Sequence, residues 1–490
     1  MKKWVLALGV GVVALGGTLA ARTALFRPDA VGDGSGIAVA QPPAFDTQAA
    51  AQHLSQAVQI QTVSHQDPAE DQQGEWTRLH SWLASTYPKA HAAMQRETLG
   101  QTLLFTWPGS DPAAQPIIVM AHQDVVPVTP GTEKDWKYPP FAGTIAEGAV
   151  WGRGTIDDKG SLIALFEAME ALAAQGFKPK RRVILVSGHD EEVGGTGAQA
   201  VAKALAARKV KALFTIDEGG LITTDTPMIN GKAAMIGVAE KGYATLQVTA
   251  HAPGGHSSAP PPANEIGSVN LAKAVLAISA KQFPMQLRGP AEGMISVLAA
   301  KAGGATKLAV ANRWLLGGMV MSKMAESPAS AAMLHTTIAP TMLTGSPKEN
   351  VLPQSASALI NYRIAPWDTS KDVLERARAA TKGLPVEVKF TDRAPREPSP
   401  VSSSNSKGWN LIAASARADQ PDLVIAPYLV VAGTDSRSMS PVSDDVYRFQ
   451  AIGLASGDIK MIHGTNEHMT LANLESLIRF YARLIATAAG

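Results

Sequence analysis

Four short apolar runs occur along the chain, and each is closely followed by histidine or acidic residues. Uninterrupted apolar runs of this length are typical of strands that are covered on both faces of a sheet. We therefore expect four buried strands with polar side chains gathered at their carboxyl ends. The runs are residues 116–121, 182–187, 212–216 and 459–462, and they lead to His122, His189, Asp217 and His463 in that order.

Helical patterns separate these runs. Apolar residues recur at helical spacing over residues 161–175, and Gly176 then ends the pattern. Two further helices are predicted over residues 198–207 and 474–486. Strands that alternate with helices predict an α/β fold with a mixed, mostly parallel sheet flanked by helices. Ligands of such sheets bind beyond the carboxyl ends of the strands, so the polar ends should share one edge.

The middle of the chain follows a different pattern, in which apolar and polar residues alternate as in strands with one exposed face. We expect an inserted α+β lid domain at residues 242–396, with the catalytic domain formed by residues 45–241 and 397–490. The lid strands are predicted over residues 243–250, 357–363 and 386–390, and its helices over residues 263–280 and 370–380.

One stretch of the insertion is unusually apolar and holds seven of the 16 methionines. It covers residues 285–342. We expect these residues to pack in the core of an enlarged lid. An adaptable apolar pocket lined by flexible methionines is the alternative.

The N-terminal segment predicts export. Lys2 and Lys3 precede an uncharged stretch from Trp4 to Ala21, which is typical of an export signal or a membrane anchor. A cleaved signal peptide and a retained anchor both fit, and we assign residues 1–26 to one of the two. Residues 27–44 are expected to form a linker. The catalytic body is thus expected outside the cytoplasm, either periplasmic or extracellular, or held at the membrane.

Composition narrows the chemistry. The 490 residues include 44 basic and 42 acidic ones, a balance that gives no reason to expect a nucleic-acid partner. The chain has no cysteine, which excludes disulfides, thiolate nucleophiles and cysteine-ligated zinc. Any metal must be held by His, Asp and Glu, a ligand set that suits zinc, manganese or cobalt in a hydrolytic site.

Acidic residues cluster near the predicted strand ends and turns. Any one of them could be a solvated loop residue, but their repeated placement after apolar strands favours a common site. If they converge, their mutual repulsion requires cations between them, and two divalent ions sharing a bridging carboxylate would meet that need. These residues are Asp157, Asp158, Asp190, Glu191, Glu192, Asp217 and Glu218.

Several motifs resemble those of the M20 metallopeptidases and occur in that family's order. The segment from His122 to Pro127 resembles the HxDVVP motif, and Trp151–Gly160 resembles the GRGxxDxKG segment. The resemblance extends over residues 45–485 and is strongest to the carboxypeptidase S-like branch, which is related to secreted N-acyl-amino-acid hydrolases. It implies a zinc-exopeptidase-like fold and a metallopeptidase activity. The other matches are residues 189–195, 217–220, 433–437 and 462–467.

The resemblance implies two divalent metal ions, Zn²⁺ or else Mn²⁺ or Co²⁺, and a role for each matched ligand. Asp157 would bridge both ions and would be joined to Asp158 by a cis peptide bond. His122 and Asp217 would complete one site. Glu192 and His463 would complete the other, and His468 is the alternative to His463.

Two further residues near the metals are assigned by the resemblance. Asp124 would orient His122 by accepting a hydrogen bond from its ring, which fixes the tautomer. Glu191 would be the general base that takes a proton from the attacking water and passes it to the leaving amine.

The lid holds three more matches. Gly255–Pro260 resembles a segment whose histidine, here His256, stabilises the oxyanion, often across a dimer interface. Asn350 and Arg363 match positions that bind the carbonyl and the terminal carboxylate of the substrate, the latter through a bidentate guanidinium. The resemblance therefore also implies a homodimer formed through the lid domain.

The favoured function is an M20-type metallocarboxypeptidase that acts on short peptides. Arg363 implies a free carboxylate beside the cleaved amide, which also fits an N-acyl-amino-acid amidohydrolase. An inactive relative that serves as a binding protein is the alternative from another class, although every matched ligand and the base are present. A dinucleotide site at residues 195–200 (GTGAQA) is rejected, because the acidic residues 190–192 directly precede it and would repel a pyrophosphate.

Overall fold

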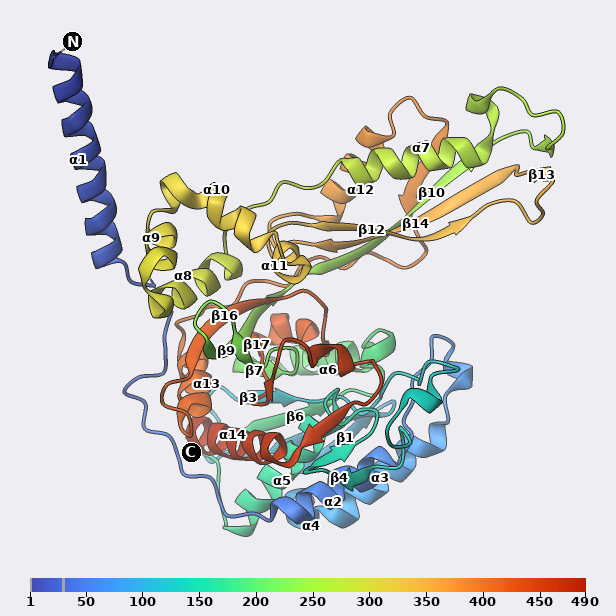
Figure 1. The fold of residues 1–490 in the computed structure, drawn as a ribbon. Coiled ribbons are helices and arrows are strands. Elements are labelled where there is room, and N and C mark those ends of the chain that lie inside the picture. The colour runs from blue at the N-terminus through green and yellow to red at the C-terminus, as the bar shows by residue number, and fades with distance from the viewer. Residues whose placement is uncertain (1, 29–30) are drawn as a thin grey trace.

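The computed structural model describes residues 2–28 and 31–490, and Figure 1 shows a catalytic body, an elongated lid and a protruding helix. The protruding helix is α1 (Lys2–Leu25). The body contains a ten-stranded mixed sheet, and the lid contains a four-stranded antiparallel sheet. Within the described part of the chain, no helix is long and apolar enough to cross a membrane.

Three of the predicted strands lie side by side in the centre of the large sheet. They are β6 (Val183–Ser187), β3 (Ile117–Met120) and β7 (Ala212–Asp217), which run parallel in that spatial order. Their residues are almost entirely buried, as the uninterrupted apolar runs predict. The other strands are β1 (Gln95–Leu99), β2 (Thr102–Trp107), β17 (Ser443–Arg448), β9 (Gly231–Glu240), β8 (Ile222–Thr226), β18 (Gly453–Leu454) and β16 (Val424–Val430).

The fourth predicted strand is wrong. Residues 459–461 form a short 3-10 helix, and His463 follows in the left-handed region with φ 60°. Local hydrogen bonds satisfy this segment, because the amide of Ile462 donates to the Ile459 carbonyl at 3.2 Å. An apolar run of four residues fits one turn of helix as well as a short strand, so the pattern alone does not distinguish them.

Helices cover both faces of the large sheet. One face packs against the helices α2, α4, α5, α13 and α14 in the main hydrophobic core, and the other packs against α6. The main-core helix α5 begins at Lys159, so its first turn lies directly beside Asp157. The helix bounds are α2 (Thr47–Val58), α3 (Gln73–Thr86), α4 (Pro88–Ala93), α5 (Lys159–Ala174), α6 (Thr196–Ala207), α13 (Lys407–Arg417) and α14 (Leu471–Ala489).

The predicted linker is irregular but lies along the catalytic body. The amide of Gly32 donates to the Ser404 carbonyl at 2.9 Å, and the indole of Trp409 donates to the Gly32 carbonyl at 2.6 Å. Further along, the amide of Ala40 donates to the hydroxyl of Thr487 at 2.9 Å. The described part of this segment is therefore held against α13 and α14.

The lid is a sheet with helices on one face only. Buried side chains such as Leu246 and Ile360 pack under its two helices, and the uncovered face is turned toward the catalytic body (Figure 1). A small two-stranded ribbon, β11 with β13, forms the far tip. The elements are β10 (Gly242–His251), β11 (Gly255–His256), α7 (Gly267–Ala280), β12 (Thr337–Thr344), β13 (Val351–Leu352), β14 (Ser355–Ile364), α12 (Ser370–Ala380) and β15 (Val386–Phe390).

The apolar stretch after α7 does not enlarge the lid core, and that expectation is wrong for its helices. The helices α8 (Pro290–Ala302), α9 (Gly304–Ala311) and α10 (Arg313–Met324) belong to the catalytic body. Ile295 and Leu298 of α8 share a buried cluster with Leu429 of β16. The chain thus leaves the lid after α7, covers the β9–β16 flank of the body, and returns through α11 (Pro328–Ala332) to β12.

Candidate active site

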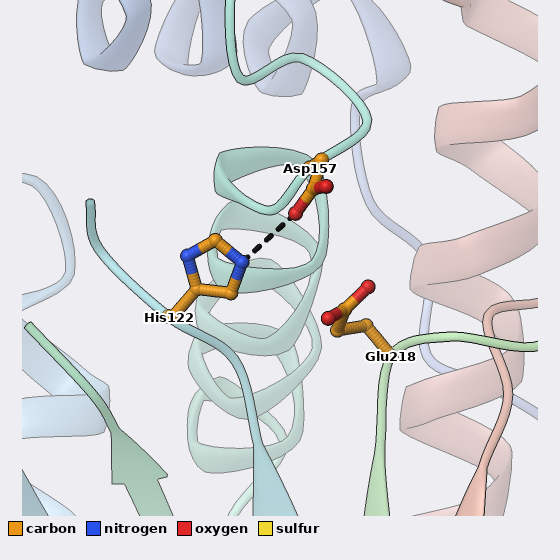
Figure 2. Close-up of side chains that lie close together, drawn as sticks. All are labelled: His122, Asp157 and Glu218. Atoms are coloured by element: carbon orange, nitrogen blue, oxygen red, sulfur yellow. Dashed lines mark hydrogen bonds and ion pairs between the residues drawn. The ribbon is translucent and has the colours of Figure 1, made fainter. Parts of the chain in front are cut away.

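Parallel strands bring the predicted site residues to one edge of the sheet. His122 follows β3 and is only 2% exposed, Glu191 and Glu192 follow β6, and Asp217 ends β7. The loop before α5 supplies Asp157 opposite these strand ends (Figure 2). The shared edge therefore forms as predicted, although His463 reaches it from a turn rather than from a strand.

One group of potential metal ligands consists of His122, Asp157 and Glu218, whose ligand atoms lie within 4.8 Å of one another (Figure 2). The Nε2 atom of His122 lies 2.9 Å from Oδ1 of Asp157. Burial raises the pKa of Glu218 well above its usual value, and the negative charges of Asp157 and Asp158 raise it further. A cation among these side chains would relieve that repulsion.

Asp217 lies outside this group, and its neighbour Glu218 lies within it. Successive residues at the end of a strand point to opposite sides, and here Glu218 turns toward His122. The Asp217 carboxylate instead accepts a hydrogen bond from the Ser436 amide at 2.9 Å. The sequence locates the acidic pair at the end of β7, and the structure places Glu218 rather than Asp217 with His122 and Asp157.

A second group consists of Asp157, Glu192 and His463. The Nε2 atom of His463 lies 3.1 Å from Oδ2 of Asp157 and 3.1 Å from Oε2 of Glu192. Asp157 belongs to both groups, with one oxygen toward each histidine, which is the arrangement a bridging carboxylate requires. The alternative ligand His468 lies outside both groups and stacks on Trp151 with a centroid distance of 4.1 Å.

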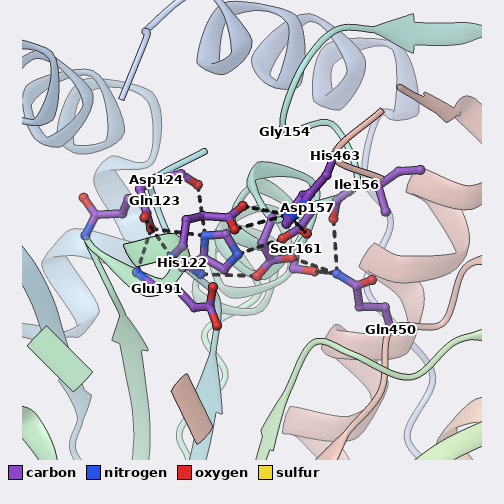
Figure 3. A network of polar contacts seen from close by, with 12 residues as sticks. His122, Gln123, Asp124, Gly154, Ile156, Asp157, Ser161, Glu191, Gln450 and His463 are labelled. Atoms are coloured by element: carbon purple, nitrogen blue, oxygen red, sulfur yellow. Dashed lines mark hydrogen bonds and ion pairs between the residues drawn. The ribbon is translucent and has the colours of Figure 1, made fainter. Parts of the chain in front are cut away.

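The carboxylate of Asp124 connects His122 to the loop that carries Glu191 and Glu192. Its Oδ1 atom lies 3.3 Å from Nδ1 of His122, and it accepts the backbone amides of both glutamates at 3.1 Å (Figure 3). Burial is the largest single cause and raises the pKa of Asp124. The hydrogen bond and charge of His122, with the hydrogen bonds from Ser64 and the Glu192 amide, together outweigh burial, so the net pKa is lowered. Asp124 is thus placed to fix the ring of His122 and the backbone of the acidic loop together.

The side chain of Glu191 stands beside the two groups without belonging to either. Burial raises its pKa well above the usual value; the nearby His122 opposes this, while the charges of Asp435 and Glu192 add to it. A carboxylate with a raised pKa that lies next to a metal site is suited to proton transfer near neutral pH.

The loop that carries Asp157 is held in place by the hydrogen bonds of its neighbour Asp158 and of Gln450. The peptide bond between Asp157 and Asp158 is cis, as the family resemblance implies. The Asp158 carboxylate accepts the backbone amide of His122 at 3.2 Å and the side-chain amide of Gln450 at 2.8 Å, and Gln450 also donates to Ser161 (Figure 3). This network fixes Asp157 relative to His122.

Sequence reasoning assigned no role to Arg153 and Glu467, which form a fully buried ion pair at 2.7 Å. Glu467 accepts the backbone amides of Ile156 and Asp157 at 2.9 and 3.2 Å, and Arg153 donates to the His463 carbonyl at 3.2 Å. The pair therefore positions a residue of each ligand group. Both residues lie inside the matched motifs at residues 151–160 and 462–467. A charged residue in a segment expected to be buried needs a charged partner, and this was the signal by which the sequence could have revealed them.

These side chains fit a metal centre. They offer imidazole nitrogens and carboxylate oxygens, the donors that zinc and similar ions accept in proteins. Burial raises the pKa of Glu192, as does the charge of Asp157. His463 shows the complementary effect, because hydrogen bonds to Asp157 and Glu192 raise its pKa to about 10. The cluster thus carries an excess of buried negative charge that divalent cations would balance.

The lid residues lie apart from this centre. His256 and Asn350 occupy the β11–β13 tip, where His256 is exposed and accepts the backbone amide of Ser258 at 3.1 Å on Nδ1. Arg363 lies nearer, on the uncovered face of the lid sheet beside Tyr243, with its guanidinium carbon 5.0 Å from the ring centroid. The β11–β13 tip lies at the end of the lid away from the body (Figure 1), so within one chain the structure does not bring His256 to the metal ligands.

A family model described as peptidase family M20/M25/M40 matches residues 118–487. The chain belongs to this family. The match includes both candidate ligand groups, Glu191 and the lid. Members of the family are metal-dependent hydrolases, and this chain is an M20 metallopeptidase by membership.

Individual M20 relatives agree with the family match. The chain is 32% identical over 442 residues to "Probable carboxypeptidase S-like 2" of Dictyostelium discoideum, covering 89% of this chain and 84% of the relative. It is 36% identical over 394 residues to the human "N-fatty-acyl-amino acid synthase/hydrolase PM20D1", covering 79% and 76%. Among solved structures, the M20 family metallo-carboxypeptidase Sso-CP2 from Sulfolobus solfataricus has a similar fold, with a TM-score of 0.64, 17% identity, and coverage of 89% and 98%.

Proposed function

We propose that this M20 enzyme hydrolyses an amide bond next to a free carboxylate and that short peptides cleaved at the C-terminus are its main substrates. The observation that carries the proposal is the pairing of a two-group carboxylate–histidine centre with a positively charged lid face beside it. The name of the Dictyostelium relative agrees with a carboxypeptidase.

The positive lid face is built around Tyr243. Arg363 lies opposite this residue on β14, and the guanidinium carbon of Arg393 lies 5.3 Å from the same ring. Arg396 is bridged to Tyr243 from the other side and donates to the Gly194 carbonyl at 2.6 Å, next to the loop of Glu191 and Glu192. The face is therefore tied to the acidic loop. A substrate carboxylate on Arg363 would direct its amide bond toward that loop.

The residues of the centre then divide the work. Two divalent ions, which we propose to be Zn²⁺ held by the two ligand groups, would supply Lewis acidity and counter-charge for the developing oxyanion. Glu191 takes a proton from the attacking water and delivers it to the leaving amine nitrogen. Asp124 keeps His122 in one tautomer, and the Arg153–Glu467 pair keeps the Asp157 loop in place.

We propose that the oxyanion donor comes from a second copy of the chain. His256 is exposed on β11, which pairs with β13 at the lid tip, away from the body that holds the metal ligands (Figure 1). Among the described residues, no strand pairs with the outer edge of β12, which ends the lid sheet and whose Leu343 side chain is 70% exposed. Edge strands with exposed apolar side chains are natural sites of strand pairing. A homodimer formed through the lids would bring His256 of the partner subunit toward the site.

We further propose that the enzyme works outside the cytoplasm. The support is the N-terminal pair of lysines followed by an uncharged stretch, a pattern typical of exported proteins. A linker rich in Gly, Pro and Ala then leads to the catalytic body.

Hydrolysis of N-acyl amino acids is the second candidate function, because a human relative that is 36% identical bears the name N-fatty-acyl-amino acid synthase/hydrolase. The Arg363 argument applies to both substrate classes, since each presents a free carboxylate beside the amide.

One panel tests these proposals. The purified chain is loaded with zinc, manganese or cobalt and assayed on dipeptides, on N-acyl amino acids, and on the same compounds with the carboxylate amidated. We expect hydrolysis of dipeptides and strong loss of activity on the amidated compounds. Activity on N-acyl amino acids alone would replace the carboxypeptidase with the second candidate. Equal activity on amidated compounds would refute carboxylate recognition, which Arg363→Met tests independently through a raised KM.

A further inference from the structure

An apolar face on α10 is left uncovered by the described residues of the rest of the chain. Trp314, Leu315 and Met319 are 57, 49 and 67% exposed, and their spacing places them on one side of the helix. The opposite side carries Val320 and Met324, which are buried in the cluster against β16. Monomeric soluble proteins rarely expose large apolar side chains as a contiguous group, and such groups mark interaction surfaces.

The uncovered face is continuous with α1. The side-chain amide of Asn312 donates to the Leu19 carbonyl at 3.3 Å and to the Thr23 hydroxyl at 3.1 Å. Arg22 donates to the Ala311 carbonyl at 3.4 Å, so the last turns of α1 lie against the α9–α10 junction. Figure 1 shows α1 extending from this corner away from the body. The exposed apolar residues on its described part are Val12, Val13, Leu15 and Leu25.

The charge of this corner is predominantly positive. Residues 2–28 and residues 290–326 together contain eight Lys and Arg residues and two acidic residues, Glu292 and Glu326, which pair with Arg313 and Lys323. The remainder of the chain carries 36 basic and 40 acidic residues, because the whole sequence carries 44 and 42. A tryptophan among aliphatic side chains with basic residues around them matches the interfacial zone of a membrane that contains anionic lipid. Basic side chains in such surfaces keep their charged ends at the headgroups while their stems cover apolar surface.

We propose that the outer face of α10, together with the exposed apolar residues of α1, rests on the surface of a lipid bilayer that contains anionic phospholipid. The catalytic edge and the lid then project from that surface, because α8 fixes α9 and α10 to the β9–β16 flank of the sheet. The surface is independent of the proposed hydrolysis, and failure of either leaves the other standing.

The absence of cysteine makes a direct test simple, because one introduced cysteine is the only labelling site. The full chain carrying Met319→Cys is labelled with a polarity-sensitive fluorophore and added to vesicles of phosphatidylcholine and phosphatidylglycerol that contain a lipid-borne quencher. The matched control is Lys371→Cys, on an exposed lid residue far from this corner. Vesicle flotation and hydrolysis by the labelled chains confirm binding and folding.

We expect a blue shift and quenching at position 319 and neither at position 371. Adding Trp314→Ser and Leu315→Ser should remove most of the quenching at position 319 while hydrolysis is unchanged. The proposal is overturned if the label at position 319 stays as solvent-exposed as the control on bound vesicles, or if the chain does not bind them. It is also overturned if the label becomes shielded without vesicles as the protein concentration rises, since a second copy would then be the occupant.

Discussion

At the scale of single residues, the adjacent glutamates 191 and 192 show how one loop separates two tasks. Asp124 accepts both of their backbone amides, yet only the Glu192 side chain reaches His463. The Glu191 carboxylate is left beside the ligand groups with a raised pKa, for which burial is the main cause. Asp124 thus fixes the backbone of both glutamates, while their side chains point to different places. Glu192 is positioned as a metal ligand and Glu191 as the base.

Replacing Glu191 by Gln should remove proton transfer but keep the metal. We expect kcat to fall by about 10²–10⁴-fold, the usual contribution of a positioned acid–base group. Metal content, measured by mass spectrometry after dialysis, should match the wild type. The exposed Glu133→Gln variant is the control and should change neither quantity. Activity within about tenfold of the wild type would rule out Glu191 as the base.

The choice between Asp217 and Glu218 is a second test at this scale. Glu218→Gln should lose one of the two proposed ions, because Glu218 lies with His122 and Asp157. Asp217→Asn should retain both ions, since its carboxylate is engaged by the Ser436 amide. Titration with zinc followed by calorimetry measures the number of sites in each variant. The reverse pattern, with loss of an ion in Asp217→Asn only, would restore the original assignment.

Residue identities near the site were largely predictable, but their orientation was not. Long motifs located His122, Asp157, Glu192 and His463, and the structure brings these four together. The sequence could not say which of two neighbouring acids faces inward, because that depends on how β7 ends within the sheet. The roles of Glu467 and Arg153 could not be predicted from the sequence either, because both act through contacts between segments that are far apart in the chain.

At the scale of elements, the hinge between β9 and β10 contains a buried lysine. The amine of Lys241 donates to the carbonyls of Ala332 and His335, both at 2.8 Å, and so joins the hinge to the segment that returns to the lid. Burial is the main cause that lowers its pKa from 10.5 to about 7, and the positive charge of Arg363 contributes. Asp368 opposes the shift.

This lysine predicts a pH dependence of stability. Between pH 7 and 10.5 the unfolded chain binds the proton and the folded chain does not, so folding stability due to Lys241 rises with pH in that window. The gain is at most about 1.4 kcal/mol for each pH unit. Urea unfolding of the wild type and Lys241→Met should show the wild type gaining relative to the variant as pH increases. An exposed control, Lys371→Met, should follow the wild type, and parallel curves for Lys241→Met would contradict the prediction.

Elements with strong periodicity were predictable, and short or tertiary ones were not. The strands β3, β6 and β7 and the helix α5 lie where the pattern places them. The prediction of a strand at residues 459–462 failed because four apolar residues are too few to distinguish the period of a strand from that of a helix. The sequence shows that the helices after α7 are apolar, but it does not show what they pack against. They pack on the body because β9 and β16 offer an apolar flank there.

At the scale of the whole molecule, the distance between His256 and its own metal ligands predicts complementation between subunits. The His256→Ala and Glu191→Gln variants should each be nearly inactive alone. After mixing and subunit exchange, half of the dimers contain both variants, and each has one site with both wild-type groups, so roughly a quarter of wild-type activity should return. Hydrolysis is measured before and after exchange.

The control is a double variant, which carries both substitutions, mixed with each single variant. Neither mixture can assemble a site that has both wild-type groups. Lack of any recovery, with exchange verified by differently tagged chains, would place His256 in a role within its own subunit or outside catalysis.

The excursion that forms α8 to α10 begins and ends at nearly the same point, because the amide of Gln286 donates to the Leu334 carbonyl at 2.8 Å. The segment can therefore be gained or exchanged as one cassette without rethreading the lid sheet, since domain insertion is tolerated where two chain ends meet. Evolution, or a protein engineer, could use this seam to retarget the enzyme to a new surface while its catalytic machinery stays as it is.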